Sequence, residues 1–455
     1  MSGICQRGAG KCRCFITSKV KLNMKNINSW KDNHWSMIEK NVFRLQLRIY
    51  KAATNQEFEK MHKIQKLLMS SQSAKYLSLK MIKQTNTDKS NTSLKTSKSK
   101  SKNNQHRLTI ETRSKQLLAY LALYPQWKGK FEAENSGFKL DKSELETIES
   151  IFIGISRNPK WVLNGEILDS FDQIDHNYLL NKCNTFQELY QQIKMYLKAG
   201  ILDGKKNIFS DLDNPLSCLL VNIALHGLKK YIENYLKITC GNSDSFTFVR
   251  YATDFVVFHP DQKVLKSVKS VILEFLKPIR LRLNLKKTEI THTLPPGFTF
   301  LDFNIFQQIK WVKLKKSQSN LQFITLIIPS KNCLKKHKSE IRQLIRRYRG
   351  ASQERLLKKL NPVIRNWTLS KSSQMSSKMF QALDQFVIFH LWKWVKRRHP
   401  LMSKYKLKKK YWHQVRTKKW VFGVKSNDKI IVQLQLHSKI PVKDYLKVTE
   451  TDSIF

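Results

Sequence analysis

Cationic and aromatic side chains alternate in two stretches near the end of this chain. One is Trp392–Pro400, where two tryptophans stand among Lys, Arg and His, and the other is Tyr405–Trp420. Eight further basic residues lie between Lys331 and Arg349, where apolar residues recur at helical spacing. Cations neutralise phosphates and aromatic rings stack on unpaired bases, so the pattern predicts binding to folded RNA. The residues predicted to contact RNA are Lys335, Lys336, Arg342, Arg346, Arg347, Arg365, Lys393, Lys396, Arg397, Arg398, Lys408, Lys409, Lys410 and Arg416.

The tryptophans of this region have a second interpretation, as core residues of a helical bundle. For Trp367 and Trp392 we expect core packing rather than contact with RNA, and Trp394 is a further core candidate. The cations at 396–398 and 406–410 are different, because they have no acidic neighbours. A solvated basic face without acidic partners has little structural purpose, so we expect these cations at RNA.

The overall charge points to the same partner. The 455 residues contain 83 Lys and Arg against 34 Asp and Glu, which leaves a formal charge of +49 and a pI of about 10.1. Such a charge opposes compact folding unless a polyanion neutralises it, so nucleic acid is the expected partner. A membrane surface is the other common polyanion. No apolar run approaches the roughly 18 residues that span a bilayer, and we expect no membrane partner.

Cysteine and histidine give no metal site. The seven cysteines are scattered and odd in number, which is typical of free thiols in a reducing compartment. Cys5, Cys12 and Cys14 lie close together, but no second pair follows at a zinc-finger spacing. No cysteine follows Cys333, and the isolated His413 and His437 form no metal cluster, so a metal-supported nuclease module is not expected. We predict no metal bound by the protein and no cofactor.

The first part of the chain resembles a targeting segment in composition. Residues 1–29 carry six basic side chains and no acidic one, as in an organellar transit peptide. The alternative is a basic arm of a protein synthesised inside an organelle. Lys far outnumbers Arg, and Lys, Asn and Ile are favoured, which is typical of AT-rich codons. We therefore expect an organellar protein, with a plastid favoured over a mitochondrion.

The elements that must position these clusters are mixed. Residues 30–82 are predicted to form an N-terminal helical segment, because apolar residues recur at helical spacing. Residues 83–106 hold almost no apolar side chain and are predicted to be a disordered polar linker. Residues 107–315 alternate helix and strand signals, so an α+β layer fold is expected. The strand candidates are Trp161–Ile167, Phe246–Val249, Phe255–Phe258 and Phe298–Ile305.

The remaining chain is predicted to be helical and then irregular. Residues 330–400 combine basic residues with a regular apolar set that includes Leu344, Leu360 and Ile364, as expected of an all-α domain. Residues 401–455 form a basic tail with a predicted hairpin that pairs Trp420–Val424 with Ile430–Leu436.

Several blocks along the chain occur together in one known family. They are Trp35–Leu79, Leu121–Trp127, Trp161–Leu180, Leu219–Gly227, Tyr251-Ala252-Thr253-Asp254, Lys286-Lys287-Thr288, Gly297–Phe303, Leu360–Trp367 and Leu391–Pro400. In this order, over residues 30 to 440, they resemble the reverse transcriptase/maturase family of group II intron-encoded proteins. The resemblance implies reverse-transcriptase-like fingers, a degenerate reverse transcriptase palm at residues 107–315, and an all-α, thumb-like maturase (X) domain at residues 330–400.

The resemblance also implies where polymerase chemistry would occur. Polymerases hold two Mg²⁺ ions with carboxylates, and the matching positions here are Glu166, Thr253 and Asp254. Thr253 removes one charge, and Glu166 extends its carboxylate by a methylene. Side chains alternate along a strand, so Asp169 faces away from Glu166 and cannot replace it. Asp172 and Asp175 follow the strand and are expected to cap the next helix.

Other polymerase features implied by the resemblance have also changed. The glycine-rich turn before the palm helix reads Leu212-Asp213-Asn214-Pro215-Leu216, the finger motif is reduced to Arg107–Thr112, and Asp302 replaces a glycine. No catalytic set is intact, and we expect polymerase activity to be lost.

Three functions are compatible with these residues. The favoured one is a maturase that binds group II intron RNA and stabilises its active fold, with the catalytic Mg²⁺ ions on the RNA. The second is an active RNA-directed DNA polymerase working through Glu166 and Asp254. The third is a general structured-RNA-binding protein that no longer promotes splicing. A homodimer is compatible with each of them.

Overall fold

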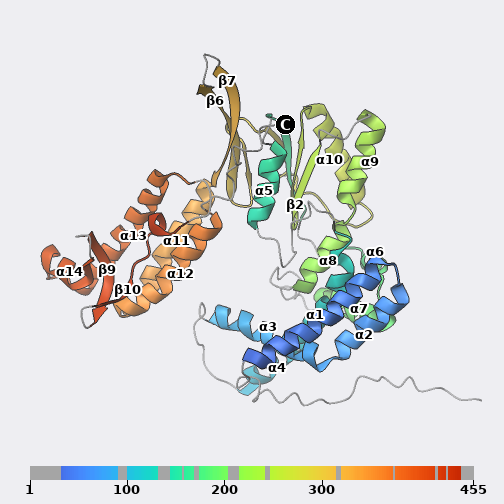
Figure 1. Cartoon of the computed structure of the whole chain (residues 1–455), viewed down its shortest axis with the longest axis horizontal. Helices are drawn as coiled ribbons and strands as arrows, with labels where there is room; N and C mark the ends of the chain where they lie inside the picture. Colours follow the sequence, from blue (N-terminus) through green and yellow to red (C-terminus); the bar gives the residue numbers. More distant parts are fainter. Residues whose placement is uncertain are drawn as a thin grey trace, which may run out of the picture. The chain divides into compact units, whose positions relative to one another are not determined.

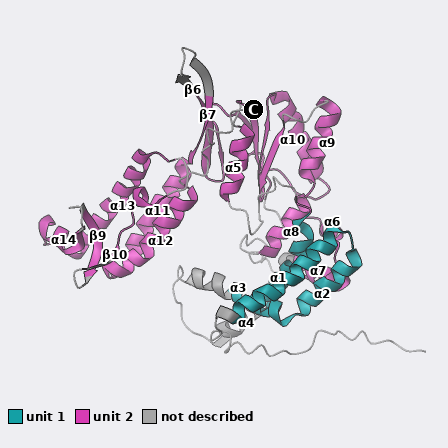
Figure 2. Cartoon of the chain, viewed as in Figure 1, with its two compact units in different colours: residues 1–129 teal, residues 130–455 magenta. Residues whose placement is uncertain are grey.

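The computed structural model describes residues 32–90, 100–131, 144–155, 158–168, 174–202, 215–240, 246–313, 319–371, 375–415, 419–426 and 429–441. The predicted basic arm, residues 1–29, lies outside these ranges. The chain divides into two compact units, residues 1–129 and 130–455 (Figure 2). No helix within the described ranges is long and apolar enough to cross a membrane.

The first unit consists of helices α1 (Asp32–Thr54), α2 (Phe58–Ser70), α3 (Gln72–Ser90) and α4 (Lys100–Lys128). As the helical spacing predicted, Ile38, Val42 and Ile49 of α1 are buried. Two polar pairs also lie inside the unit. The amide of Gln65 donates to Gln126 Oε1 at 2.9 Å, and the hydroxyls of Ser78 and Ser114 are 2.7 Å apart.

The prediction for residues 83–106 is wrong at both ends of the tract. Helix α3 continues to Ser90 and α4 begins at Lys100, while residues 91–99 lie outside the described residues. Lys, Gln and Asn tolerate helical backbone, so these polar residues extend helices whose other ends are packed. Residues 107–128 were assigned to the palm, but they lie in α4, which packs on α1, α2 and α3.

The second unit contains an antiparallel sheet in the order β2-β3-β1-β4, of which β2 is labelled in Figure 1. Its strands are β1 (Trp161–Glu166), β2 (Thr247–Tyr251), β3 (Asp254–His259) and β4 (Glu289–His292). Phe255–Phe258 is buried without interruption, because α5 (Glu144–Ile155) packs on β2 and α10 (Gln262–Leu276) packs on β1, β3 and β4. The other helices of this region are α6 (His176–Cys183), α7 (Gln187–Leu202), α8 (Pro215–Leu225) and α9 (Leu228–Cys240).

A second sheet joins the palm to the helices that follow. It contains β5 (Phe298–Phe300), β6 (Phe303–Lys313) and β7 (Ser319–Pro329). The predicted continuous strand Phe298–Ile305 is therefore wrong. Leu301 and Asp302 adopt φ values of 47° and 67°, and this left-handed pair reverses the chain between β5 and β6.

The C-terminal region is a helical domain with a small sheet against it. Helices α11 (Lys331–Arg347), α12 (Gln353–Lys371), α13 (Ser377–Arg398) and α14 (Lys404–Tyr411) are followed by β8 (Trp412–Val415), β9 (Lys419–Ser426), β10 (Lys429–Gln433) and the 3₁₀ helix η3 (His437–Lys439). The predicted hairpin is present as β9 and β10. Residues 401–455 were predicted to be a separate tail, but the described residues among 401–441 are part of the helical domain. Five side chains of this segment share one core with α11, α12 and α13: Leu407, Tyr411, Trp412, Phe422 and Leu434.

Candidate functional site

Two carboxylates meet where β1 and β3 end. The antiparallel register pairs Glu166 with Asp254, so their side chains leave the same face of the sheet as neighbours. The hairpin that carries Asp254 turns through Ala252, at φ 55°, and Thr253. The carbonyl of Thr253 accepts a hydrogen bond from Ile167 N at 2.9 Å. The structure thus unites the three positions that the resemblance named, with a hydroxyl in place of one carboxylate.

The Glu166 carboxylate already has partners from the protein. Lys287 Nζ donates to Oε1 at 2.9 Å, and Asn284 Nδ2 donates to Oε2 at 2.6 Å. A two-metal polymerase site needs carboxylate oxygens free to bridge two Mg²⁺ ions. Here the Lys287 ammonium group compensates the charge of the Glu166 carboxylate, and the second of the three metal-binding positions is Thr253, which carries no charge. Within the described ranges, no group of three or more His, Cys, Asp or Glu side chains could hold a metal ion. These residues do not fit the family's metal pair.

The buried Arg250 side chain connects the hairpin turn to α8 by hydrogen bonds. This side chain is only 1% exposed, and its Nη1 donates to Asn222 Oδ1 of α8 at 2.9 Å and to the Ala252 carbonyl at 2.8 Å. The turn is therefore fixed to the palm helix by a cation and not by apolar packing alone. Sequence reasoning missed this role, although a lone cation inside an apolar strand was its signal.

The acids that follow β1 are structural where they can be described. Asp175 caps α6 by accepting a hydrogen bond from Tyr178 N at 2.8 Å, which confirms its predicted role. Asp169 and Asp172 lie outside the described residues, and so do Leu212, Asp213 and Asn214.

Three tryptophans of the C-terminal domain pack against other rings or backbone, with Trp394 buried and Trp367 and Trp392 partly buried. Trp367 stacks on His337 at a centroid distance of 4.2 Å, and Trp392 stacks on Trp412 at 4.2 Å. Trp394 is buried, and its indole N–H donates to the Tyr348 carbonyl at 3.0 Å. The predicted core role of these side chains is confirmed.

A buried polar chain attaches residues after β10 to the helices. Asp384 of α13 accepts hydrogen bonds from His437 N at 2.7 Å and from Ser438 N at 3.2 Å. Its Oδ1 is also 2.9 Å from Nδ1 of His437, whose Nε2 lies 3.0 Å from Nε2 of His337 in α11. Burial raises the pKa of Asp384, but hydrogen bonds from His437 and Ser438 outweigh it and leave this pKa below its usual value.

Helix α13 carries three rings that lie beside cations of α11 and α13, and we call them the aromatic strip: Phe386, Phe389 and His390. Lys338 and Arg342 of α11 both lie 5.6 Å from the Phe386 ring, and Lys393 lies 4.4 Å from the Phe389 ring. Phe389 is 53% exposed. Burial lowers the pKa of His390, and Arg342 and Lys393 lower it further, so this ring is neutral near pH 7.

A second exposed pair lies on α14 and β9. Lys409 stands 4.7 Å from the ring of Tyr405, and Lys408 stands 4.4 Å from the ring of Trp420. Both rings are partly open to solvent. Exposed aromatic rings flanked by ammonium groups are suited to stacking on bases while the cations meet phosphates.

Most of the predicted RNA-contacting cations are on the surface, but their surroundings differ. Lys336 forms an ion pair with Asp302 at 3.3 Å, and Arg398 donates to the carbonyls of Arg349 and Ala351 while lying over Trp394. Arg398 thus attaches the segment that follows α11 to the end of α13. Arg416 lies outside the described residues. The exposed members are Lys335, Lys336, Arg342, Arg346, Arg347, Arg365, Lys393, Lys396, Arg397, Arg398, Lys409 and Lys410.

Family models match a reverse transcriptase region and a following maturase region of the chain. The model of the reverse transcriptase (RNA-dependent DNA polymerase) domain matches residues 97–333, and that of the N-terminal domain of reverse transcriptase matches residues 30–112. The group II intron maturase-specific domain matches residues 334–412. This chain belongs to the reverse transcriptase/maturase family of group II intron proteins. The predicted α+β class, with a reverse-transcriptase-like region followed by a helical domain, is confirmed.

Individual relatives are similar over limited stretches. The group II intron-encoded protein LtrA of Lactococcus lactis subsp. cremoris is 34% identical over 112 residues, which cover 22% of this chain and 18% of LtrA. Less than a fifth of that relative is therefore matched. Among solved structures, a telomerase from Candida albicans in complex with a fragment of telomeric RNA aligns with a TM-score of 0.30 and 12% identity. That alignment covers 64% of this chain and 54% of the telomerase.

Proposed function

We propose that this protein binds group II intron RNA and promotes splicing by stabilising the active RNA fold, without synthesising DNA. The observation that carries the proposal is the contrast between its two sites. In the palm, Lys287 and Asn284 donate hydrogen bonds to the two oxygens of the Glu166 carboxylate, and Thr253 stands where the family has an acid. In the maturase domain, exposed aromatic rings lie among cations on a fully packed core.

In this proposal the palm is a scaffold. Its sheet and helices retain a continuous core, and the β5–β7 sheet leads directly into α11. Lys371 of α12 also pairs with Glu144 of α5 and lies 4.9 Å from the Phe303 ring. The catalytic Mg²⁺ ions would belong to the RNA, which performs its own transesterifications. We further propose an organellar location, with a plastid favoured, on the composition of the chain.

Splicing of a candidate group II intron at moderate Mg²⁺ tests the proposal. With the purified protein the rate is expected to rise, and intron RNA is expected to outcompete unrelated structured RNA of equal length. An equal rate with and without protein would refute the maturase role. Equal competition by unrelated RNA would favour the general RNA-binding protein.

Polymerase activity is the second candidate, and the direct pairing of Glu166 with Asp254 favours it. Two adjacent carboxylates could hold a single metal ion. Primer extension with intron RNA and Mg²⁺ separates the two functions. We expect no cDNA above background from the wild-type protein. Mg²⁺-dependent cDNA that disappears in Asp254→Ala would show that the palm is still an enzyme.

A further inference from the structure

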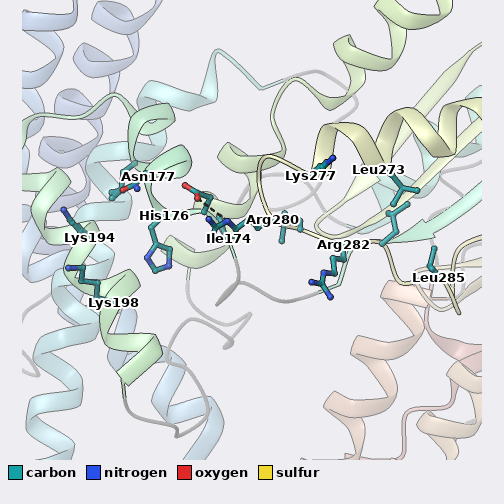
Figure 3. A pocket seen from close by; sticks show the side chains of 14 residues that line it. Ile174, His176, Asn177, Lys194, Lys198, Leu273, Lys277, Arg280, Arg282 and Leu285 are labelled. Atoms are coloured by element: carbon teal, nitrogen blue, oxygen red, sulfur yellow. Dashed lines mark ion pairs between the residues drawn. The ribbon is translucent and has the colours of Figure 1, made fainter.

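A large open pocket lies in the palm, and none of its lining residues belongs to the maturase domain. Its volume is about 1060 Å³, and it is formed by the start of α6, by α7 and by the segment that follows α10. Figure 3 shows His176, Lys194 and Lys198 on one side and Arg280 and Arg282 on the other. None of these side chains was predicted to contact RNA.

The pocket is strongly cationic. Among the described residues that line it, the cations are Lys194, Lys198, Lys277, Arg280 and Arg282, and the one carboxylate is that of Asp175. This carboxylate is already used, since Oδ1 accepts from Tyr178 N at 2.8 Å and Oδ2 lies 3.5 Å from Arg280 Nε. The lining therefore has an excess of positive charge, which favours an anionic ligand.

The backbone at Arg280 is a second, independent observation. Arg280 has a φ of 61°, in the left-handed turn that ends α10, where Leu281 N donates to the Leu276 carbonyl at 3.2 Å. Glycine is the residue that favours this position, and a side chain there destabilises the fold. The Arg280 side chain is 72% exposed, so its pairing with Asp175 gives little in return. A residue with a strained backbone whose side chain adds little to stability is a candidate for binding.

The same segment is tied to the vestigial polymerase site. Leu168 N donates to the Arg282 carbonyl at 2.9 Å, and Asn284 N donates to the Glu166 carbonyl at 2.8 Å. The cations of the pocket thus lie on a loop that is hydrogen-bonded to the end of β1. Two exposed leucines, Leu273 and Leu285, add apolar surface beside them.

We infer that this pocket binds the phosphate groups of an RNA strand, which makes the palm a second RNA-binding surface beside the maturase domain. The inference rests on the proposed function for the identity of the RNA. Its cations are spread over α7 and the 277–282 segment and do not converge on one point, and such a distribution suits successive phosphates of a strand. Free nucleoside triphosphates share the phosphate chemistry and are separated by the test.

The test uses the full chain with Arg280→Gly and Arg282→Gln combined. The glycine removes one cation and also the left-handed side chain, so the melting temperature is expected to stay equal or rise. Affinity for intron RNA is expected to fall about tenfold at roughly 0.1 M salt. The slope of log K against log salt should fall in magnitude by about 1.4, since each single-strand phosphate contact contributes about 0.7.

A matched control removes the same charge elsewhere. Lys230→Gln with Lys266→Gln alters two exposed cations on α9 and α10 that do not line the pocket. This variant is expected to keep the wild-type salt slope. An equal fall in slope in both double variants would overturn the inference, because only net charge would then matter.

Binding of a fluorescent nucleoside triphosphate tests whether the pocket takes a free nucleotide instead of an RNA strand. We expect no difference between wild type and the pocket variant, because the ligand is a strand. Loss of triphosphate binding with unchanged RNA affinity would overturn the inference and assign a nucleotide pocket instead. Absence of preference for intron RNA in the wild type is a separate result. It would refute the proposed function. RNA binding by the pocket would still be tested by comparing the salt slopes of the wild type and the pocket variant on any structured RNA.

Discussion

Acidification should destabilise the maturase domain through His337. This side chain is 1% exposed, stacked on Trp367, and hydrogen-bonded through Nε2 to His437. Burial lowers the pKa of His337 to about 3, and His437 adds to the effect. The perturbation is a change from pH 7 to pH 5, compared between the wild type and His337→Gln, which keeps a donor towards His437 but does not titrate in this range.

The magnitude follows from proton linkage. The unfolded chain binds a proton at His337 with a pKa near 6.5, whereas the folded chain does so only near pH 3. Between these values the unfolded state binds more protons, so the free energy of unfolding falls as the pH falls. At pH 5 the loss relative to pH 7 is about 2 kcal/mol for this one group.

Urea unfolding followed by tryptophan fluorescence at both pH values measures this loss. His226, whose pKa is lowered to about 4 by burial and by Lys182, Arg250 and Lys130, contributes in both proteins and cancels in the comparison. The wild type should lose about 2 kcal/mol more than His337→Gln. Only the difference between pH values within each protein is used, so any effect of the substitution at pH 7 does not enter. Equal losses in the two proteins would refute the assignment of a buried neutral His337.

Three substitutions test other parts of the structure. Phe389→Ala in the aromatic strip should weaken binding to intron RNA by about 1–3 kcal/mol with an unchanged melting temperature, as measured by filter binding and thermal unfolding; unchanged affinity would remove the ring from the interface. Gly165→Ala places a β-carbon against the Phe255 ring, too close for van der Waals contact, and should destabilise the palm by about 1–3 kcal/mol in urea; wild-type stability would contradict the packing. Arg398→Gln should lower the melting temperature by about 2–4 °C without changing the salt slope of RNA binding, because Arg398 attaches the segment after α11 to α13; the opposite result would restore it as an RNA contact.

Much of the fold could be predicted because it depends on local patterns. The apolar spacing of Ile38, Val42 and Ile49 predicted α1, and the apolar run after Asp254 predicted a buried strand. Composition alone was a poorer guide. The polar tract at 83–106 looked unable to fold, yet α3 and α4 extend into it. Helix formation at those ends depends on neighbouring packed turns, which composition does not report.

The candidate sites divide in the same way. Charge and aromatic content predicted that the maturase domain binds RNA, and the change to Thr253 predicted an altered palm. Those conclusions need only the kinds of residues present and their order along the chain. Phe386, Phe389 and Lys338 were missed, although their spacing on cationic helices was a usable signal.

Only the tertiary structure decided which of these residues meet. Strand register set Glu166 opposite Asp254, and Lys287, far along the chain, compensates the Glu166 carboxylate. Asp384 and His437 are 53 residues apart, yet their hydrogen bonds make the segment after β10 part of the domain. Residue type and order are properties of the chain. Hydrogen-bond partners, burial and the charge around each group depend on distances between remote segments, which exist only after folding.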